Sequence, residues 1–220
     1  RMQVLLADMS SRGVEADIYT YNTLIHYLRR KDNHAAMLDV FESLHDRGIK
    51  PDFDTHNAVL LNLSPERSFE LLKKWVEDPR VDVIPKYISI VARKFEKDTH
   101  GCWEVYKYAR ENNLPTNDEL YKVVMERIEK DPEIVITVFE DLEANGIAPT
   151  MQSVKLAIDA CFQTKSIERA LGVLKYAASK DTEVPPGEIM NVMIESVNAD
   201  RTDQMIQVFD FVQEYKFDVT

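Results

Sequence analysis

The chain has little of several residue types on which particular protein classes depend. Its 220 residues include only two cysteines, Cys102 and Cys161, whose wide separation fits neither a disulfide framework nor a zinc site. None of the five histidines lies in an HExxH pattern, and no glycine-rich loop of the kind that holds phosphate is present. We therefore expect no metal, no cofactor and no catalytic group, so the chain is not predicted to be an enzyme.

Long apolar runs and an excess of positive charge are also missing. No stretch approaches the roughly 18 apolar residues that a membrane-spanning helix needs. The formal net charge is −11, from 27 Lys and Arg against 38 Asp and Glu. This excludes a general nucleic-acid coat, because neutralising phosphates requires clustered cations. The acidic excess lies in residues 118–150, with nine acids and three bases, and in residues 187–220, with seven and two. These segments are candidates for contact with basic protein.

The chain does have a repeated helical pattern. Apolar or small residues at i, i+3, i+4 and i+7 mark one buried face of a helix. Seven such faces recur every 31 to 35 residues, with third members at 6, 41, 72, 106, 139, 174 and 209. A second set of faces lies between them and begins at Tyr21, His56, Ile88, Tyr121, Val154 and Met190. Because a two-helix hairpin cannot cover its own apolar face, we expect the hairpins to stack in series.

A short phrase that ends helices recurs with the same period. It reads RGVEAD at 12–17, RGIKPD at 47–52 and NGIAPT at 145–150. Gly13, Gly48 and Gly146 are placed where a helix commonly ends in a left-handed conformation, which glycine adopts at little cost. Pro51 and Pro149 follow three residues later, where the chain cannot remain helical. The phrase predicts the bend between one repeat and the next, and Asp32 or Asn33 could cap the second helix of the first complete repeat.

Residues 18–52 resemble the pentatricopeptide repeat consensus, in their YNTLI opening and GIKPD close. Tetratricopeptide and HEAT-like repeats have similar lengths, but the tryptophan and Leu-Gly pair of a tetratricopeptide first helix are absent. The later repeats match mainly in helical register. The resemblance implies an all-α, right-handed α-solenoid that forms a single array. Its expected parts are a partial repeat at 1–17 and repeats at about 18–52, 53–84, 85–117, 118–150, 151–186 and 187–220, in a fragment of a longer chain.

The resemblance also implies a way of binding RNA. Members of the pentatricopeptide family that the chain resembles line a groove with the first helices of their repeats and hold single-stranded RNA there, one base per repeat. In the family, the fifth and last residues of a repeat choose the base, and the second residue packs on it. In the first complete repeat these are Asn22, Asp52 and Tyr19, and Asn with Asp is the family's pair for uridine. Arg29 and Arg30 could contact phosphate, or could simply stabilise a helix end.

The same correspondence is weaker in the following repeats. Asn57 keeps the amide, but its partner is either Ile84 or Lys86, depending on register. Ser89 with Asn117 resembles the family's pair for adenine if Ile88 is the fourth residue, which the buried pattern favours over Ile90. Lys122 with Thr150 and Lys155 with Pro186 match no familiar pair, and Asn191 with Thr220 is marginal.

Two functions remain open from the sequence. One is an RNA-binding module that holds a single strand through its amino-terminal repeats. The other is a non-catalytic scaffold subunit of a mitochondrial ribosome or an RNA-processing complex, whose acidic repeats contact basic protein. A combined role fits the charge distribution best: a neutral half on RNA and an acidic half on protein subunits of an organellar ribonucleoprotein. The resemblance implies the mitochondrial matrix, or the chloroplast if the chain comes from a plant.

Overall fold

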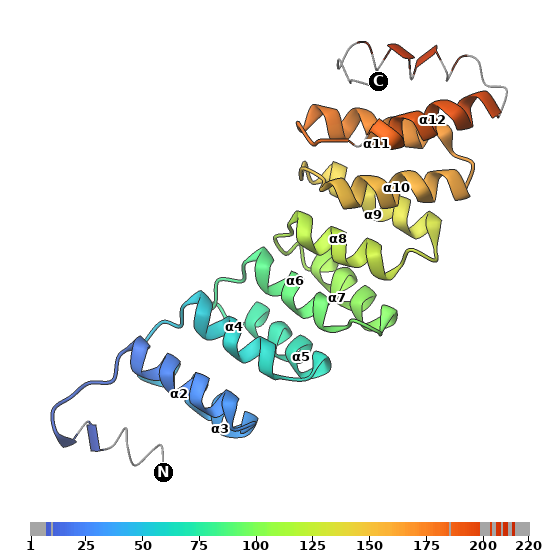
Figure 1. Cartoon of the computed structure of the whole chain (residues 1–220). Helices are drawn as coiled ribbons and strands as arrows, with labels where there is room; N and C mark the ends of the chain where they lie inside the picture. Colours follow the sequence, from blue (N-terminus) through green and yellow to red (C-terminus); the bar gives the residue numbers. More distant parts are fainter. Residues whose placement is uncertain are drawn as a thin grey trace. The chain divides into compact units, whose positions relative to one another are not determined.

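The computed structural model describes residues 8–9, 11–184 and 186–198, together with positions 203, 206–207, 209–210 and 213. Throughout these described residues the regular structure is helical and contains no strand (Figure 1). The predicted all-α class is confirmed. The chain divides into two compact units between Val83 and Ile84. None of the described helices is long and apolar enough to cross a membrane.

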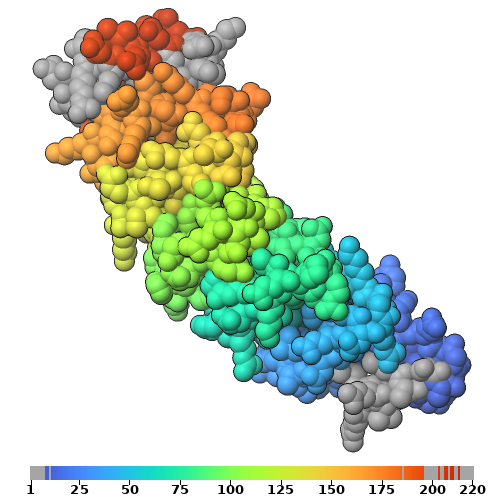
Figure 2. Space-filling view, turned by 180° about the vertical axis from the view of Figure 1, so that it is seen from behind, coloured from blue at the N-terminus to red at the C-terminus, as the bar shows by residue number. Residues whose placement is uncertain are grey.

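The helices pair as the periodicity predicted, a first and a second helix in each repeat. The first unit contains α2 (Ile18–Arg30), α3 (His34–Asp46), α4 (Phe53–Asn62) and α5 (Pro65–Glu77). The second unit contains α6 (Pro85–Lys94), α7 (Thr99–Glu111), α8 (Asp118–Arg127), α9 (Pro132–Ala144), α10 (Met151–Gln163), α11 (Ile167–Ser179) and α12 (Pro186–Asn198). Figure 2 shows the helices of the second unit following one another in chain order.

The first helices contact one another in series within each unit. In the first unit α2 packs against α4, and in the second α6 packs against α8, α8 against α10, and α10 against α12. The apolar faces predicted between Tyr21 and Ala177 are buried, except that Leu24 and Leu71 are half-buried. Each hairpin therefore gains part of its core from its neighbours, which is how repeat arrays become stable.

The prediction for α12, the first helix of the last repeat, placed its buried face one residue too late. The sequence pattern placed Met190 and Ile194 inside, but they are 42% and 50% exposed, while Ile189 and Val192 are fully buried. The reason is that α12 begins at Pro186, whose fixed φ suits the first turn of a helix. This starting point makes Ile189 the fourth residue of the helix, and the fourth residue is the buried one in the other first helices. Phe209 was also expected inside and is 52% exposed. The other residues of the outermost predicted faces lie outside the described side chains: Met2, Leu5, Leu6, Val197, Met205, Val208 and Val212.

Side-chain caps start most of the first helices. Asp17, Asp52, Asn117 and Thr150 each precede a first helix and accept a hydrogen bond from the backbone N–H three residues on. Ile84 precedes α6 and has no such bond, but Pro85 occupies the first helical position. In the first complete repeat, the second helix α3 is capped by Asn33 and not by Asp32: the Asn33 side chain accepts a hydrogen bond from the Ala36 N–H. The cap fixes where a helix begins, and thereby which residues face its neighbours.

The bends between repeats have the predicted backbone conformation. Gly13, Gly48 and Gly146 have φ of +73°, +70° and +69°. Asn113 and Asp181 take the same left-handed conformation at the ends of α7 and α11, with φ of +51° and +54°. The repeated phrase did not reveal these two bends, because it contains a glycine and these bends use asparagine and aspartate, which also tolerate the left-handed region.

A partly buried carboxylate joins three helices of the second unit. Asp141 of α9 accepts hydrogen bonds from the hydroxyl of Tyr106 on α7 at 2.8 Å and from that of Tyr121 on α8 at 2.9 Å. The guanidinium of Arg110, also on α7, lies 2.5 Å from the same carboxylate. Burial and this hydrogen bond raise the pKa of Tyr106, and burial raises that of Tyr121 to about 12. Both hydroxyls therefore remain donors, and the network fixes how the three helices pack.

Two glycines of the second unit should respond oppositely to alanine. Both are exposed, with open space where a Cβ would lie, but Gly146 has φ of +69° whereas Gly172 lies inside α11. Gly146→Ala should lower the free energy of unfolding by about 1 kcal/mol, because a Cβ strains the left-handed conformation. Gly172→Ala should raise it by roughly 0.5–1 kcal/mol through helix propensity. Urea unfolding followed by circular dichroism measures both; changes of the same sign would contradict this account of the bends.

Candidate nucleic-acid interface

The structure brings the side chains of Asn22 and Asp52 together across 30 residues of sequence. Asn22 is the fifth residue of α2, and Asp52 directly precedes α4. The amide nitrogen Nδ2 of Asn22 donates to Oδ2 of Asp52 at 3.2 Å and lies 3.4 Å from Oδ1. The packing of α2 against α4 therefore places a polar pair where two consecutive first helices meet.

Thr55 is a third member of this site, and the family resemblance did not single it out. Its hydroxyl oxygen lies 2.6 Å from Oδ1 of Asn22 and 2.6 Å from Oδ1 of Asp52. Its backbone N–H donates to Oδ1 of Asp52 at 2.8 Å, and the Asp52 N–H donates back to the hydroxyl at 3.3 Å. This is a capping box, and an Asp followed by Thr three residues later before an apolar run is a sequence signal that could have revealed it.

The carboxylate of Asp52 is held in its ionised form. Burial acts to raise its pKa, but the hydrogen bonds from the Thr55 hydroxyl, the Thr55 N–H and the Asn22 amide outweigh that effect, so that the pKa is lowered overall. At neutral pH Asp52 is therefore an acceptor only, and the group of Asn22 that faces it must be the donor.

Exposed side chains surround this site on α2. Tyr19, one turn before Asn22, is 77% exposed, so its ring is available for stacking. Tyr27 is 56% exposed on the same helix. Arg29 and Arg30 are exposed in the last turn of α2, as expected. The first repeat thus combines an amide–carboxylate pair, an exposed aromatic ring and two cations.

The second predicted pair is incomplete. Asn57 is half-buried at the fifth position of α4. Because α6 begins at Pro85, the closing residue of this repeat is Ile84 and not Lys86. Ile84 has an apolar side chain that can neither donate nor accept a hydrogen bond. The structure thereby decides between the two registers that the sequence left open, in favour of the one without a polar partner.

The third predicted pair is not assembled as expected. Ile88 is the fourth residue of α6 and is fully buried, which confirms the chosen register. Ser89, however, is only 2% exposed, and its hydroxyl is directed to the backbone carbonyls of Pro85 and Lys86 at 3.3 and 3.2 Å. Asn117 caps α8 by accepting from the Leu120 N–H. Ser89 was expected in the exposed lining, and its burial within the α6 packing face removes it from there.

Lysines at the fifth positions of later helices differ in their surroundings. The ammonium of Lys122 lies 3.0 Å from Glu119 on the same helix, and Glu119 also forms an ion pair with Arg93 of α6. Lys155 is exposed at the fifth position of α10. The fifth residue of α12 is Met190, so the expected role of Asn191 is wrong. Its predicted partner, Thr220, lies outside the described residues, and so does Pro185, which precedes α12.

Reactive or metal-binding groups do not stand out in the described part of the chain. No group of three or more His, Cys, Asp or Glu side chains there could hold a metal ion. Cys102 and Cys161 are buried, and burial raises the pKa of each thiol to about 12. A thiol with so high a pKa is not a nucleophile at neutral pH.

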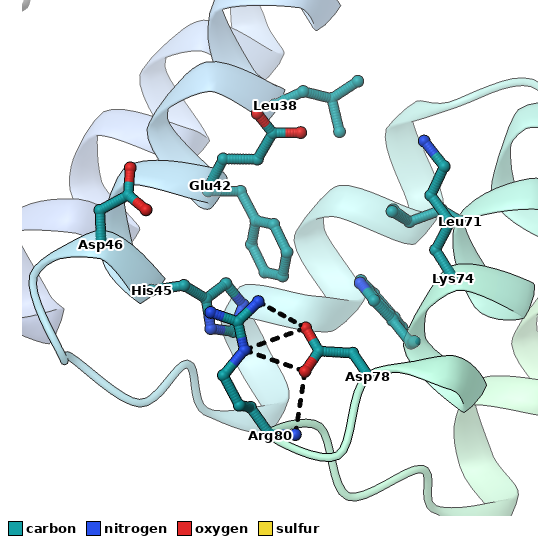
Figure 3. A pocket seen from close by; sticks show the side chains of 10 residues that line it. Leu38, Glu42, His45, Asp46, Leu71, Lys74, Asp78 and Arg80 are labelled. Carbon is teal, nitrogen blue, oxygen red and sulfur yellow. Dashed lines mark hydrogen bonds and ion pairs between the residues drawn. The ribbon is translucent and has the colours of Figure 1, made fainter.

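A pocket of about 350 Å³ lies between α3 and α5 in the first unit (Figure 3). Asp78 and Arg80 close one end, with the guanidinium 2.7 Å from the carboxylate, and these hydrogen bonds lower the pKa of Asp78 to about 2. The pocket is lined by Leu38, Phe41, Glu42, His45, Asp46, Leu71, Lys74, Trp75, Asp78 and Arg80. Three carboxylates and two permanent cations nearly balance, so the lining selects neither an anion nor a cation.

His56 connects the start of α4 to the aromatic side chains of this pocket. Its Nδ1 lies 2.8 Å from the backbone oxygen of Asp52, and since a carbonyl can only accept, the ring donates. The ring packs edge-to-face on Trp75 at 4.7 Å and on Phe41 at 5.4 Å between centroids. Burial lowers the pKa of His56 and outweighs the opposite effect of its hydrogen bond to Asp52; the nearby His45 and Lys50 also lower it.

The protonation of His56 should therefore reduce stability. A histidine in an unfolded chain has its pKa near 6.5, and the folded value lies below that. As pH falls below 6.5, the unfolded chain binds the proton first, so the free energy of unfolding should decrease. Urea unfolding at pH 7.5 and pH 5.5 should show this loss, and His56→Gln should reduce its size. An imidazole NMR signal, assigned through that variant, that titrates above 6.5 would contradict the buried environment.

Comparisons with known proteins agree with the repeat pattern and the helix pairs. A family model of the pentatricopeptide repeat domain matches residues 4–63. A pentatricopeptide repeat-containing protein of Arabidopsis thaliana is 23% identical over 128 residues, which cover 54% of this chain and 22% of that protein. A second Arabidopsis thaliana protein, named as mitochondrial and pentatricopeptide repeat-containing, is 29% identical over 83 residues, which cover 36% and 13%.

A solved structure extends the likeness over the whole chain. The pentatricopeptide repeat protein PPR10 from maize matches 100% of this chain and 32% of its own with a TM-score of 0.55, at 17% sequence identity. At this identity the match shows the fold, and it confirms the predicted α-solenoid. The chain spans less than a quarter of each of the two curated relatives. The repeat register, the family model matched over residues 4–63 and the shared solenoid fold together make the chain similar to pentatricopeptide repeat proteins.

Proposed function

We propose that the chain binds single-stranded RNA through its first helices, and that the site formed by Tyr19, Asn22 and Asp52 accommodates one uridine. The observation that carries this proposal is the hydrogen bond from the Asn22 amide to the ionised Asp52 carboxylate. An amide oriented in this way can still donate one N–H and accept one hydrogen bond, which complements O4 and N3–H of uracil. Tyr19 supplies an exposed ring on which the base can stack.

The first unit is better suited to RNA than the second. In the first, Arg29 and Arg30 are exposed in the last turn of α2 and can contact phosphates, which position a strand without reading it. In the second, Glu119 forms ion pairs with both Arg93 and Lys122, and its negative charge weakens the attraction of these two cations for phosphates. We therefore assign the base-selective contact to the start of the array, and we propose binding, not cleavage, as the activity of this chain.

The relatives support an organellar setting for this binding. One curated relative is named as mitochondrial. We infer that the chain acts in mitochondrial RNA metabolism as a non-catalytic subunit of a ribonucleoprotein assembly, and that its acidic second unit contacts basic protein subunits there. The charge count favours this second contact, because residues 118–150 carry nine acids against three bases.

The RNA contact is tested with an oligouridine strand. The double variant Asn22→Ala, Asp52→Ala should weaken binding by about 1–3 kcal/mol at fixed salt, because it removes the direct base contact. Asp39→Ala serves as the control: it removes one exposed carboxylate from α3, matching the charge change at Asp52 without touching the pair. Fluorescence anisotropy at stated ionic strength gives the affinities. Equal affinity of the wild type and the double variant, or no binding by the wild type, would end this proposal.

The protein contact is tested by charge reversal on α8 and the turn that follows it. Glu126→Lys with Glu129→Lys should release basic partners that co-purify from mitochondria, and should do so most clearly at low salt, where screening is weak. Glu133 and Glu140 are left unchanged because both pair with Arg169. Glu42→Lys with Glu77→Lys, at two exposed positions of the first unit, provides the control with an equal change in net charge. Quantitative mass spectrometry that finds the same partners in all three samples would rule out the acidic contact.

A further inference from the structure

We propose that Thr55 is a positioning residue for base selection: together with Asp52 it holds the Asn22 amide in one orientation, and so makes the site prefer uridine to cytidine. The inference rests on the proposed RNA binding and adds a residue to it. Thr55 does not belong to the repeat that contains Asn22, since it is the third residue of the next first helix, α4.

The amide of Asn22 has both of its polar atoms engaged. Nδ2 faces the Asp52 carboxylate at 3.2 Å, and Oδ1 lies 2.6 Å from the Thr55 hydroxyl. Rotating the amide by half a turn would place its oxygen against an ionised carboxylate, which repels it. The single hydroxyl proton lies between two acceptors, Oδ1 of Asn22 and Oδ1 of Asp52, both 2.6 Å from the hydroxyl oxygen, so this hydroxyl contacts both side chains at once. The observed orientation is therefore the favoured one.

The orientation of the amide decides which pyrimidine it can bind. At the edge that both pyrimidines share, uracil presents an N3–H donor beside the O4 acceptor, and cytosine presents the N3 acceptor beside an N4–H donor. An amide that rotates freely can satisfy either base by exchanging its oxygen and nitrogen. An amide held in one orientation can satisfy only one base in a given stacked position. Immobilising Asn22 is thus a source of specificity, apart from any gain in affinity.

The position of the Thr55 hydroxyl is itself fixed by the fold. Thr55 is completely buried, and its N–H and hydroxyl form the capping box with Asp52 at the start of α4. A β-branched residue has few accessible χ1 rotamers in a helix, so burial of the methyl group determines where the oxygen lies. The hydroxyl therefore acts as a rigid reference for the side chains of Asn22 and Asp52.

The chain contains a matched side chain without the amide contact. Thr20, the half-buried third residue of α2, makes two of the corresponding contacts with Asp17: its N–H and hydroxyl lie 2.9 and 2.8 Å from Oδ1 of Asp17. The third residues of α6 and α8 are Tyr87 and Leu120, which cannot replace the hydroxyl in this geometry. Among the helices α2 to α10, the combination of amide, carboxylate and hydroxyl is found where α2 meets α4.

The experiment compares Thr55→Val with Thr20→Val in binding to oligouridine and oligocytidine strands of equal length. Each change removes one capping hydroxyl at nearly constant shape, and urea unfolding measures the structural cost, which should be larger at the fully buried Thr55. Thr55→Val should reduce the preference for oligouridine over oligocytidine by about three- to tenfold, in line with the loss of one hydrogen bond. Thr20→Val should keep the wild-type preference, and Thr55→Ser, which restores the hydroxyl, should return most of it. Circular dichroism confirms that each variant is folded.

The outcomes separate the inference from the function on which it rests. A wild type that binds neither strand, or that shows no preference, overturns the proposed RNA reading. A wild-type preference that is lost in Asn22→Ala but kept in Thr55→Val overturns the role of Thr55 alone. A second measurement needs no RNA: the side-chain amide protons of Asn22 in the free protein should exchange faster with water in Thr55→Val than in Thr20→Val. Equal exchange rates would also overturn it.

Discussion

The start of each first helix is the constraint on which the rest of the structure depends. A helix that begins one residue earlier turns every side chain by about 100°, so the cap decides what is buried and what is presented. Asp52 shows the coupling most directly, since one carboxylate accepts the Thr55 N–H that starts α4 and also receives the Asn22 amide. The residue that would select a base is therefore also the residue that fixes the helix carrying the next base site.

This double role explains why the later repeats lose polar pairs without losing their fold. Helix initiation can be met by several side chains, and the chain uses Asn117 and Thr150 as caps and Pro85 at the first position of α6. Each substitute starts its helix, so the apolar faces still stack. A base-selecting pair demands more, because its amide and its carboxylate must both be in place. The repeat fold is therefore kept in repeats where the polar pair is absent.

Periodicity in the sequence predicts the packing but not the site. The buried faces from Tyr21 to Ala177 follow from spacing alone, because neighbouring hairpins must cover them. Individual side chains depend on local atoms that spacing does not encode. Thr55 contacts the Asn22–Asp52 pair because it forms a capping box with Asp52. Ser89 does not face the expected lining, because its hydroxyl bonds to a backbone carbonyl of its own helix. The phase of α12 is set by Pro186, and the apolar pattern alone predicted the wrong face.

The ion pairs of Glu119 with Arg93 and Lys122 also bear on kinetics. Clefts lined with unpaired cations accelerate the diffusional encounter with nucleic acid about 10- to 1000-fold through long-range attraction. A protein of net charge −11, in which Glu119 already pairs with two cations, gains little from that attraction beyond the two exposed arginines at the end of α2. RNA bound by this chain would then be captured slowly, and tight association would depend on a long residence time of each strand.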